Sequence, residues 1–174
     1  LFLIGYMGSG KSSVGKRLAN RMDMEFIDMD RMIEDFAKAT IEDIFDKSGE
    51  ETFRSLENHI LLKLLQEGPK VIATGGGTVC HSDNMEAILD QGYAVYIQLP
   101  ARKLRKRVSQ SNENRPLIRE RVGKDLTTFI SNHLKEREVF YKQAHMVIDG
   151  DKVNSQLLGD IKENYLDWSD NQTR

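Results

Sequence analysis

The stretch GYMGSGKSS (residues 5–13) directly follows the apolar run LFLI (residues 1–4) at the start of the chain. It contains three glycines and one lysine, whereas a tight turn needs a single glycine. We interpret the extra glycines as a backbone that must wrap closely around a ligand. The lysine indicates that this ligand carries negative charge. The stretch therefore predicts an anion-binding loop between a first strand and a first helix.

Four residues of this stretch, Gly5, Gly10, Lys11 and Ser12, fit the pattern G-x-x-x-x-G-K-[ST] of a P-loop. The expected strand before it and helix after it supply the context that the motif requires. Backbone N–H groups in such a loop, together with the helix N-terminus, form a cradle for phosphates. Lys11 would reach the outer phosphates, and the Ser12 hydroxyl would bind Mg²⁺. The motif predicts binding of a nucleoside triphosphate.

Composition excludes several other classes of protein. The chain has 174 residues, of which 39% are hydrophobic and 30% charged, and a formal net charge of −2. The chain lacks the excess of basic residues that would indicate a nucleic-acid partner. It also has no apolar run long enough for a membrane span. The single cysteine, Cys80, excludes an internal disulfide and favours a reducing compartment, so we expect a cytoplasmic protein. We expect a monomer, because no large exposed apolar patch can be inferred. The chain begins at Leu1, so we expect a few natural residues to precede it.

Short apolar runs alternate with longer helical patterns along the whole chain, which predicts one α/β domain over residues 1–174. We expect three layers (α/β/α) around a central five-stranded parallel sheet, the P-loop kinase fold. A polar segment at 109–124 is expected to be a mobile lid, and the final DNQTR to be frayed. The expected strands are 1–5, 25–28, 70–74, 94–99 and 146–149; the expected helices are 11–22, one from Thr40, 49–67, 83–91, 101–108, 126–144 and 153–166.

Among P-loop proteins, the length and motifs favour a kinase of small molecules. A GTPase should carry N-K-x-D, which the sequence lacks, so the D-x-x-G match at residues 46–49 is attributed to chance. A motor or transporter ATPase would need an early apolar strand that ends in aspartate and a large partner surface. The only comparable strand, residues 146–149, comes too late in the chain.

Asp28 and Asp30 follow the second expected strand, at the sheet edge where α/β proteins bind ligands. In an extended segment both carboxylates would lie on one side. One could then hold Mg²⁺ through water, and the other could accept the proton of an attacking hydroxyl. The alternative is that Asp30 is merely the N-cap of the helix that follows.

Other candidates have simpler interpretations beside the functional one. Arg54 and Glu57 are spaced i, i+3 and would ordinarily form a weak surface salt bridge. Residues 75–77, three glycines after an apolar strand, indicate close approach of the backbone to a ligand rather than a plain loop. Arg115 lies in the expected lid, a segment that would close over phosphates. Arg137 lies among charged residues, where a solvated helix face is the default interpretation.

Taken in order, GYMGSGKSS, FIDMD, FRSLE, GGG, RPL and REVFY resemble the motifs of the shikimate kinase family over nearly the full chain. The resemblance implies transfer of the γ-phosphoryl group of ATP to the 3-hydroxyl of shikimate, with Mg²⁺, in aromatic amino-acid biosynthesis. It places the shikimate-binding region at about 29–60, and shikimate would be the only partner, with no nucleic acid or membrane.

The resemblance also implies roles for particular residues. Lys11, Asp30 and Arg115 would be catalytic, and Ser12 and Asp28 would hold the metal, Asp28 through water. ATP would be bound by Gly8, Ser9, Gly10, Lys11, Ser12, Ser13 and Arg115; shikimate would be bound by Asp30, Arg54, Gly75, Gly76, Gly77 and Arg137.

Two features leave alternatives open. The residues that contact adenine have no clear counterpart, and Arg107 and Lys152 are the candidates. Gluconate kinase shares the P-loop and the size, but it is not expected to combine the aspartate pair, F-R-x-x-E and the triple glycine. A nucleotide-binding regulatory module without turnover is the other alternative. Against it, the P-loop and both aspartates are intact.

Overall fold

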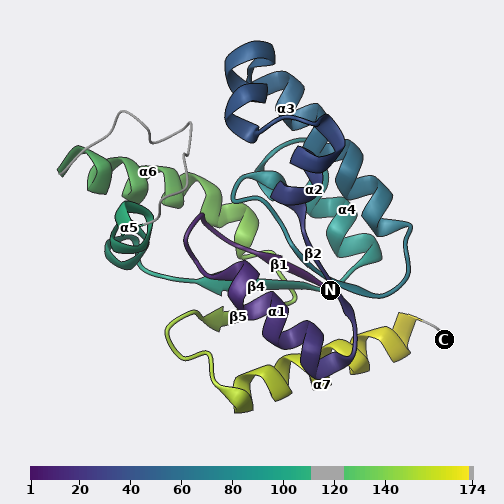
Figure 1. Ribbon diagram of the computed structural model, residues 1–174. Coiled ribbons are helices and arrows are strands. Elements are labelled where there is room, and N and C mark those ends of the chain that lie inside the picture. The colour runs from purple at the N-terminus through teal and green to yellow at the C-terminus, as the bar shows by residue number, and fades with distance from the viewer. Residues whose placement is uncertain (111–123, 173–174) are drawn as a thin grey trace.

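A computed structural model of the chain describes residues 1–110 and 124–172, which form a parallel sheet with helices on both faces (Figure 1). All neighbouring strands are parallel, and their order is β2-β3-β1-β4-β5. Sequence analysis therefore predicted the fold class and the five strands correctly. The strands are β1 (Phe2–Ile4), β2 (Glu25–Asp28), β3 (Lys70–Ala73), β4 (Ala94–Gln98) and β5 (Met146–Asp149).

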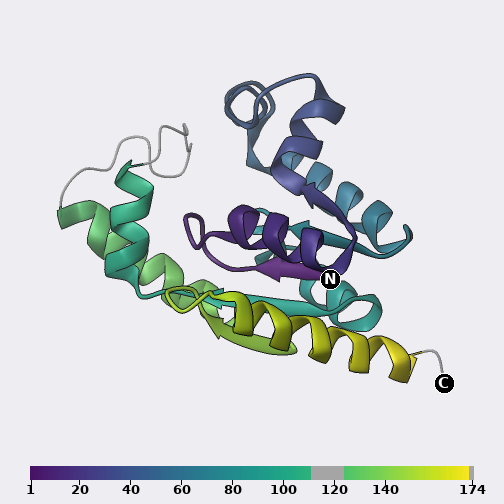
Figure 2. The same ribbon diagram turned by 60° about the horizontal axis from the view of Figure 1, so that its bottom comes forward.

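The alternation of side chains along the strands divides the core into two layers. Phe2 and Ile4 face one cluster, which contains buried residues of helices α3, α4, α5 and α6. Leu3 and Ile148 face the other cluster, which α1 and α7 cover; Figure 2 shows α7 running along this side of the sheet. The helices are α1 (Lys11–Met22), α2 (Met29–Ala37), α3 (Ile41–Leu65), α4 (Asn84–Gln91), α5 (Ala101–Gln110), α6 (Lys124–Tyr141) and α7 (Ser155–Gln172), with a 3₁₀ turn η1 (Thr78–Cys80).

Helix α3 is bent at Gly49, whose φ of 80° and ψ of 169° are not helical. The two separate helices expected from Thr40 and from residue 49 are therefore its two halves. The Thr40 hydroxyl accepts a hydrogen bond from the backbone N–H of Asp43 at 3.1 Å and so caps the first half. The second half buries Phe53, Ile60 and Leu64 in the same cluster as Phe2 and Ile4 of β1.

Several expected boundaries were wrong. The C-terminal tail is helical as far as Gln172, not frayed from residue 170. One reason is that Trp168 packs within 6 Å of the Tyr93 and His145 rings and holds α7 against the sheet. Helix α7 begins at Ser155, because the Asn154 side chain accepts from the backbone N–H of Leu157. Of the expected lid at 109–124, residues 109 and 110 belong to α5 and residue 124 belongs to α6. Residues 111–123 lie outside the described residues.

Candidate active site

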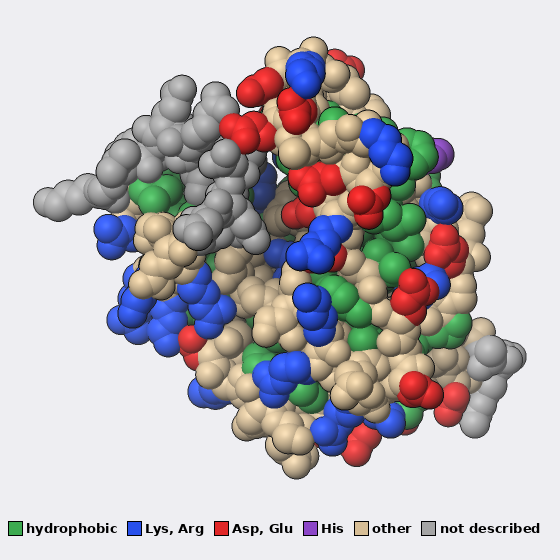
Figure 3. Space-filling view, in the orientation of Figure 1, with side chains coloured by type: hydrophobic (Ala, Val, Ile, Leu, Met, Phe, Trp, Pro, Cys, Tyr) green, Lys and Arg blue, Asp and Glu red, His purple; other side chains and the backbone are tan. Residues whose placement is uncertain are grey.

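The carboxyl ends of β1, β2 and β3 open into a cleft of about 1200 Å³. Its walls are the P-loop, the start of α2, the two halves of α3, the triple glycine and Arg137 of α6. Figure 3 shows the molecule hollowed beneath α3 on this face. Parallel strands bring their following loops to one edge of the sheet, so segments distant in sequence meet there. The cleft is the candidate site.

The P-loop adopts the conformation that its glycines allow. Gly5, Gly8 and Gly10 all have positive φ (139°, 77° and 101°), and α1 begins directly afterwards at Lys11. The Lys11 ammonium donates to the carbonyls of Gly5 at 2.8 Å and Tyr6 at 3.1 Å, across the loop.

Most of the predicted phosphate-binding residues line this cleft. Ser9 does not, because its side chain is buried, and only its backbone could contact a ligand. The residues that line the cleft are Gly8, Gly10, Lys11, Ser12 and Ser13.

Asp28 and Asp30 both line the cleft, but not for the reason expected from an extended segment. Helix α2 begins at Met29, so Asp28 ends β2 and Asp30 lies in the first helical turn. The N-cap interpretation of Asp30 was wrong for the same reason, since the N-cap position is Asp28. Asp28 accepts a hydrogen bond from the Ser12 hydroxyl at 2.7 Å. The two predicted metal-binding residues are therefore adjacent.

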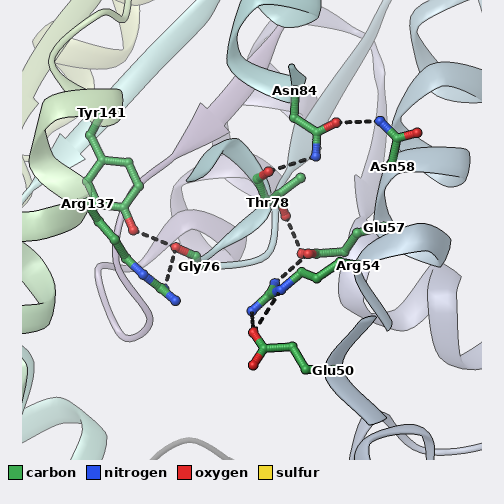
Figure 4. Close-up of polar contacts among 9 residues, drawn as sticks. All are labelled: Glu50, Arg54, Glu57, Asn58, Gly76, Thr78, Asn84, Arg137 and Tyr141. Atoms are coloured by element: carbon green, nitrogen blue, oxygen red, sulfur yellow. Dashed lines mark hydrogen bonds and ion pairs between the residues drawn. The ribbon is translucent and has the colours of Figure 1, made fainter. Parts of the chain in front are cut away.

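Arg54 and Glu57 form a buried ion pair, so the surface interpretation was wrong. The side chain of Glu57 is 1% exposed and that of Arg54 is 12% exposed, and Nη1 of Arg54 donates to Glu57 at 2.5 Å. The other carboxylate oxygen of Glu57 accepts from the Thr78 hydroxyl at 2.6 Å. Glu50 accepts from Nε and Nη2 of Arg54 at 3.1 and 2.8 Å, so that Arg54 lies between two glutamates (Figure 4).

Arg137 is also buried, at 6% exposed, although its charged neighbours indicated a solvated face. Its Nη1 donates to the carbonyl of Gly76 at 3.1 Å, and its guanidinium lies 5.9 Å from the Tyr6 ring centroid. A Cβ atom added at Gly77 would lie 3.0 Å from Nη1 of Arg54 and 3.3 Å from Nη2 of Arg137. The two guanidinium groups therefore converge on the space beside Gly77.

Two of the three glycines, Gly75 and Gly76, leave no space for a side chain. A Cβ at Gly75 would lie 2.7 Å from a Glu57 oxygen and 2.9 Å from an Asp30 oxygen, and one at Gly76 would lie 2.9 Å from the backbone nitrogen of Met7. None of the three has a positive φ. The close approach that the structure shows is to other residues of the cleft, and the predicted approach to a ligand stays a prediction.

The remaining candidates have mixed outcomes. Arg115 lies outside the described residues. Arg107 donates to the P-loop carbonyl of Ser9 at 3.1 Å, which places it beside the phosphate loop. Lys152 is 80% exposed and pairs with Asp149. Burial raises the pKa of the Cys80 thiol to about 11, so it is protonated at neutral pH and a poor nucleophile.

Sequence reasoning missed four residues that hold the site together. Glu50 and Tyr141 are each four residues from a predicted arginine, so helical spacing could have indicated them. Thr78 and Asn84 had no such signal: Asn84 donates to the Thr78 carbonyl and accepts from Asn58. Within the described part of the chain, no cluster of three His, Cys, Asp or Glu residues could hold a metal. In the same part, no helix is long and apolar enough to cross a membrane.

The fold and the cleft, in which a phosphate-binding loop adjoins two converging arginines, define a P-loop kinase of small molecules. The shikimate kinase family model matches residues 7–165. The chain belongs to the shikimate kinase family, and its activity is the ATP-dependent phosphorylation of shikimate.

Individual relatives agree with this assignment. The chain is 40% identical over 167 residues to a shikimate kinase of Azobacteroides pseudotrichonymphae, covering 95% of this chain and 96% of the relative. A crystal structure of shikimate kinase from Bacteroides thetaiotaomicron has a TM-score of 0.85 at 32% identity, covering 93% and 95% of the two chains. The Acinetobacter baumannii enzyme in complex with shikimate has a TM-score of 0.83 at 34% identity, covering 95% and 92%.

The family assignment also decides against the alternatives. A gluconokinase from Sinorhizobium meliloti has a TM-score of 0.57 at 14% identity, covering 99% of this chain and 94% of its own. At that identity only the fold is shared. The gluconate kinase and regulatory-module interpretations were therefore wrong.

The pH dependence of stability should reveal the environment of His133, which lies on α6 and is hydrogen-bonded to the Tyr6 hydroxyl. Burial, helped by the charges of Arg137 and Arg54, lowers the pKa of His133 from 6.5 to about 4. As the pH falls from about 6.5 towards 4, His133 is protonated in the unfolded chain but stays neutral in the folded chain. Protonation thus favours the unfolded chain, and the free energy of unfolding decreases over this range. His133→Gln should lose less unfolding free energy between pH 7 and pH 5, measured by urea titration.

The comparison uses the difference between the wild type and His133→Gln in how the free energy of unfolding changes with pH. Burial also lowers the pKa of His145, which is present in both proteins and contributes equally to both. Parallel slopes for the wild type and His133→Gln would contradict the assignment of a depressed pKa to His133.

Proposed function

We propose that the chain transfers the γ-phosphoryl group of ATP to the 3-hydroxyl of shikimate, giving shikimate 3-phosphate and ADP. The observation that carries this proposal is the convergence of Arg54 and Arg137 beside Gly77, in the same cleft as the P-loop. A planar carboxylate is matched by forked guanidinium donors better than by any other side chain. A small acceptor with a carboxylate would therefore be held at a fixed distance from the phosphates.

On the nucleotide side, the backbone of residues 8–13 would bind the phosphates at the N-terminus of α1. Lys11 would direct its charge at the outer phosphates, and Arg115 would add a further cation. Lys11 is held at the base of the cleft, where it is 8% exposed, which supports this role.

The residues beside the P-loop fit a magnesium ion. Ser12 and Asp28 offer a hydroxyl and a carboxylate 2.7 Å apart, and Mg²⁺ prefers oxygen ligands. Nucleotide-bound Mg²⁺ needs only one or two protein ligands, so the two residues suffice. When bound, the ion would neutralise charge on the phosphate oxygens.

On the acceptor side, Arg54 and Arg137 would bind the carboxylate, and Gly75, Gly76 and Gly77 would let the ring approach the backbone. Asp30 would orient the attacking hydroxyl and accept its proton. Its position supports this role, because Asp30 lines the cleft and one of its carboxylate oxygens would lie 2.9 Å from a Cβ atom added at Gly75. Phosphoryl transfer depends mainly on such positioning and on charge neutralisation. Action as a cytoplasmic monomer, without a nucleic-acid or membrane partner, stays a prediction.

The direct test is a coupled ADP-release assay with Mg·ATP, run with shikimate, with gluconate and without an acceptor. We expect ADP release only with shikimate, because gluconate has the carboxylate but lacks the ring. Release with gluconate alone, or equal release in all three reactions, would contradict the proposal.

Asp30→Asn should lower kcat by about 100-fold or more, since the amide cannot accept the proton, while ATP binding stays near normal. Steady-state kinetics and a nucleotide titration measure the two effects. Asp90→Asn is the matched control, because Asp90 is exposed on α4 outside the cleft. An unchanged kcat in Asp30→Asn would remove Asp30 from the proposed chemistry.

Arg54→Lys and Arg137→Lys should each raise the KM for shikimate by about 10-fold or more, because an ammonium replaces the two parallel hydrogen bonds of a guanidinium. The KM for ATP should change little. Arg17→Lys, at an exposed position of α1, is the control for the substitution itself. Wild-type shikimate affinity in both variants is the result that would refute the carboxylate clamp.

A further inference from the structure

Tyr141, the last residue of α6, is completely buried, at 0% exposed. Its hydroxyl donates a hydrogen bond to the carbonyl oxygen of Gly76 at 2.5 Å. The same oxygen accepts from Nη1 of Arg137 at 3.1 Å. Figure 4 shows the two side chains approaching Gly76 from α6. A carbonyl has two lone pairs, and these two donors use both.

The loop that Gly76 belongs to needs such a fixed point. Residues 75–77 have no side chains that could pack, and glycine has the largest conformational freedom of any residue. On the side of α3, the loop is held where Thr78 donates to Glu57. On the side of α6, the described contacts that hold it are those of Arg137 and Tyr141 to Gly76. Loss of either contact would loosen the loop where the two arginines converge.

Tyr141 is suited to this task because it is rigid and stays protonated. Its ring packs against the Tyr96 ring, with centroids 5.1 Å apart. Burial raises the pKa of Tyr141 well above 10, so the hydroxyl is a donor throughout the physiological range. The contact to Gly76 is therefore independent of pH.

The contact also fixes Arg137. Arg137 and Tyr141 are spaced i, i+4 and so lie on one face of α6. Arg137 uses Nη1 for the Gly76 carbonyl, and its Nη2 lies beside Gly77, where it could donate to an acceptor. Gly76 also packs against the Met7 backbone, so its position relates the acceptor loop to the P-loop.

We propose that Tyr141 is a positioning residue for the acceptor, which acts through the Gly76 carbonyl on Arg137 and on the loop of residues 75–77. The proposal rests on the proposed function, because it assumes that an acceptor carboxylate binds between Arg54 and Arg137. Tyr141 itself lies behind the loop and touches neither substrate.

The test is Tyr141→Phe, which removes only the hydroxyl. The KM for shikimate, and its Kd measured by calorimetry without turnover, should rise by about 3- to 10-fold, the factor that corresponds to one buried hydrogen bond. The kcat and the KM for ATP should stay within about 2-fold. Tyr96→Phe is the matched control, because Tyr96 is a buried neighbour whose hydroxyl has no bond to the loop in the described contacts.

A second measurement separates positioning from a merely structural role. In an Arg137→Lys background, Tyr141→Phe should raise the shikimate Kd by less than about 2-fold, since the residue through which it acts is already impaired. Fully additive effects, an unchanged Kd in Tyr141→Phe, or failure of that variant to fold at 25 °C would each overturn the proposal. Failure of the wild-type enzyme to release ADP with shikimate would instead refute the proposed function.

Discussion

The acceptor half of the cleft depends on one constraint, the buried carboxylate of Glu57. A charge that is 1% exposed is tolerated only when it is paired and hydrogen-bonded. Arg54 supplies the pair from the same helix, and Thr78 supplies a hydrogen bond from the turn after β3. Removing one partner of a buried pair typically costs about 3–5 kcal/mol. Glu57 thus joins α3 to the glycine loop, and Arg54 is fixed as a consequence.

The two halves of the cleft achieve rigidity by different means. The P-loop is held largely from within, by three glycines at positive φ, the helix that starts at Lys11 and the Lys11 ammonium, and Arg107 of α5 adds a contact from outside. The acceptor loop has no such conformation, and side chains from α3 and α6 hold it from outside. Apart from Arg107, the first arrangement is local in sequence, whereas the second depends throughout on contacts between distant residues, up to 65 positions apart.

This difference decides what the sequence could reveal. The P-loop and the sheet were predictable, because a strand, a glycine motif and a helix follow one another within 22 residues. The geometry of Asp28 and Asp30 was not, since helix α2 already begins at Met29, within the segment that we expected to be extended. Local charge patterns also could not show that Arg54 and Arg137 are buried, because their burial comes from elements distant in sequence. Only the family resemblance indicated a role for Arg137.

The glycine at the bend of α3 is required for a different reason from the glycines of the acceptor loop. Beside Gly49 a Cβ atom would meet nothing within 4 Å, yet φ is 80°. Beside Gly75 the backbone is ordinary, but no volume is left for a Cβ. Glycine is therefore needed at position 49 for its positive φ, and at position 75 because it has no side chain. A residue of mirror-image chirality would suit the bend and be excluded from the loop, so one amino acid meets two unrelated demands within one chain.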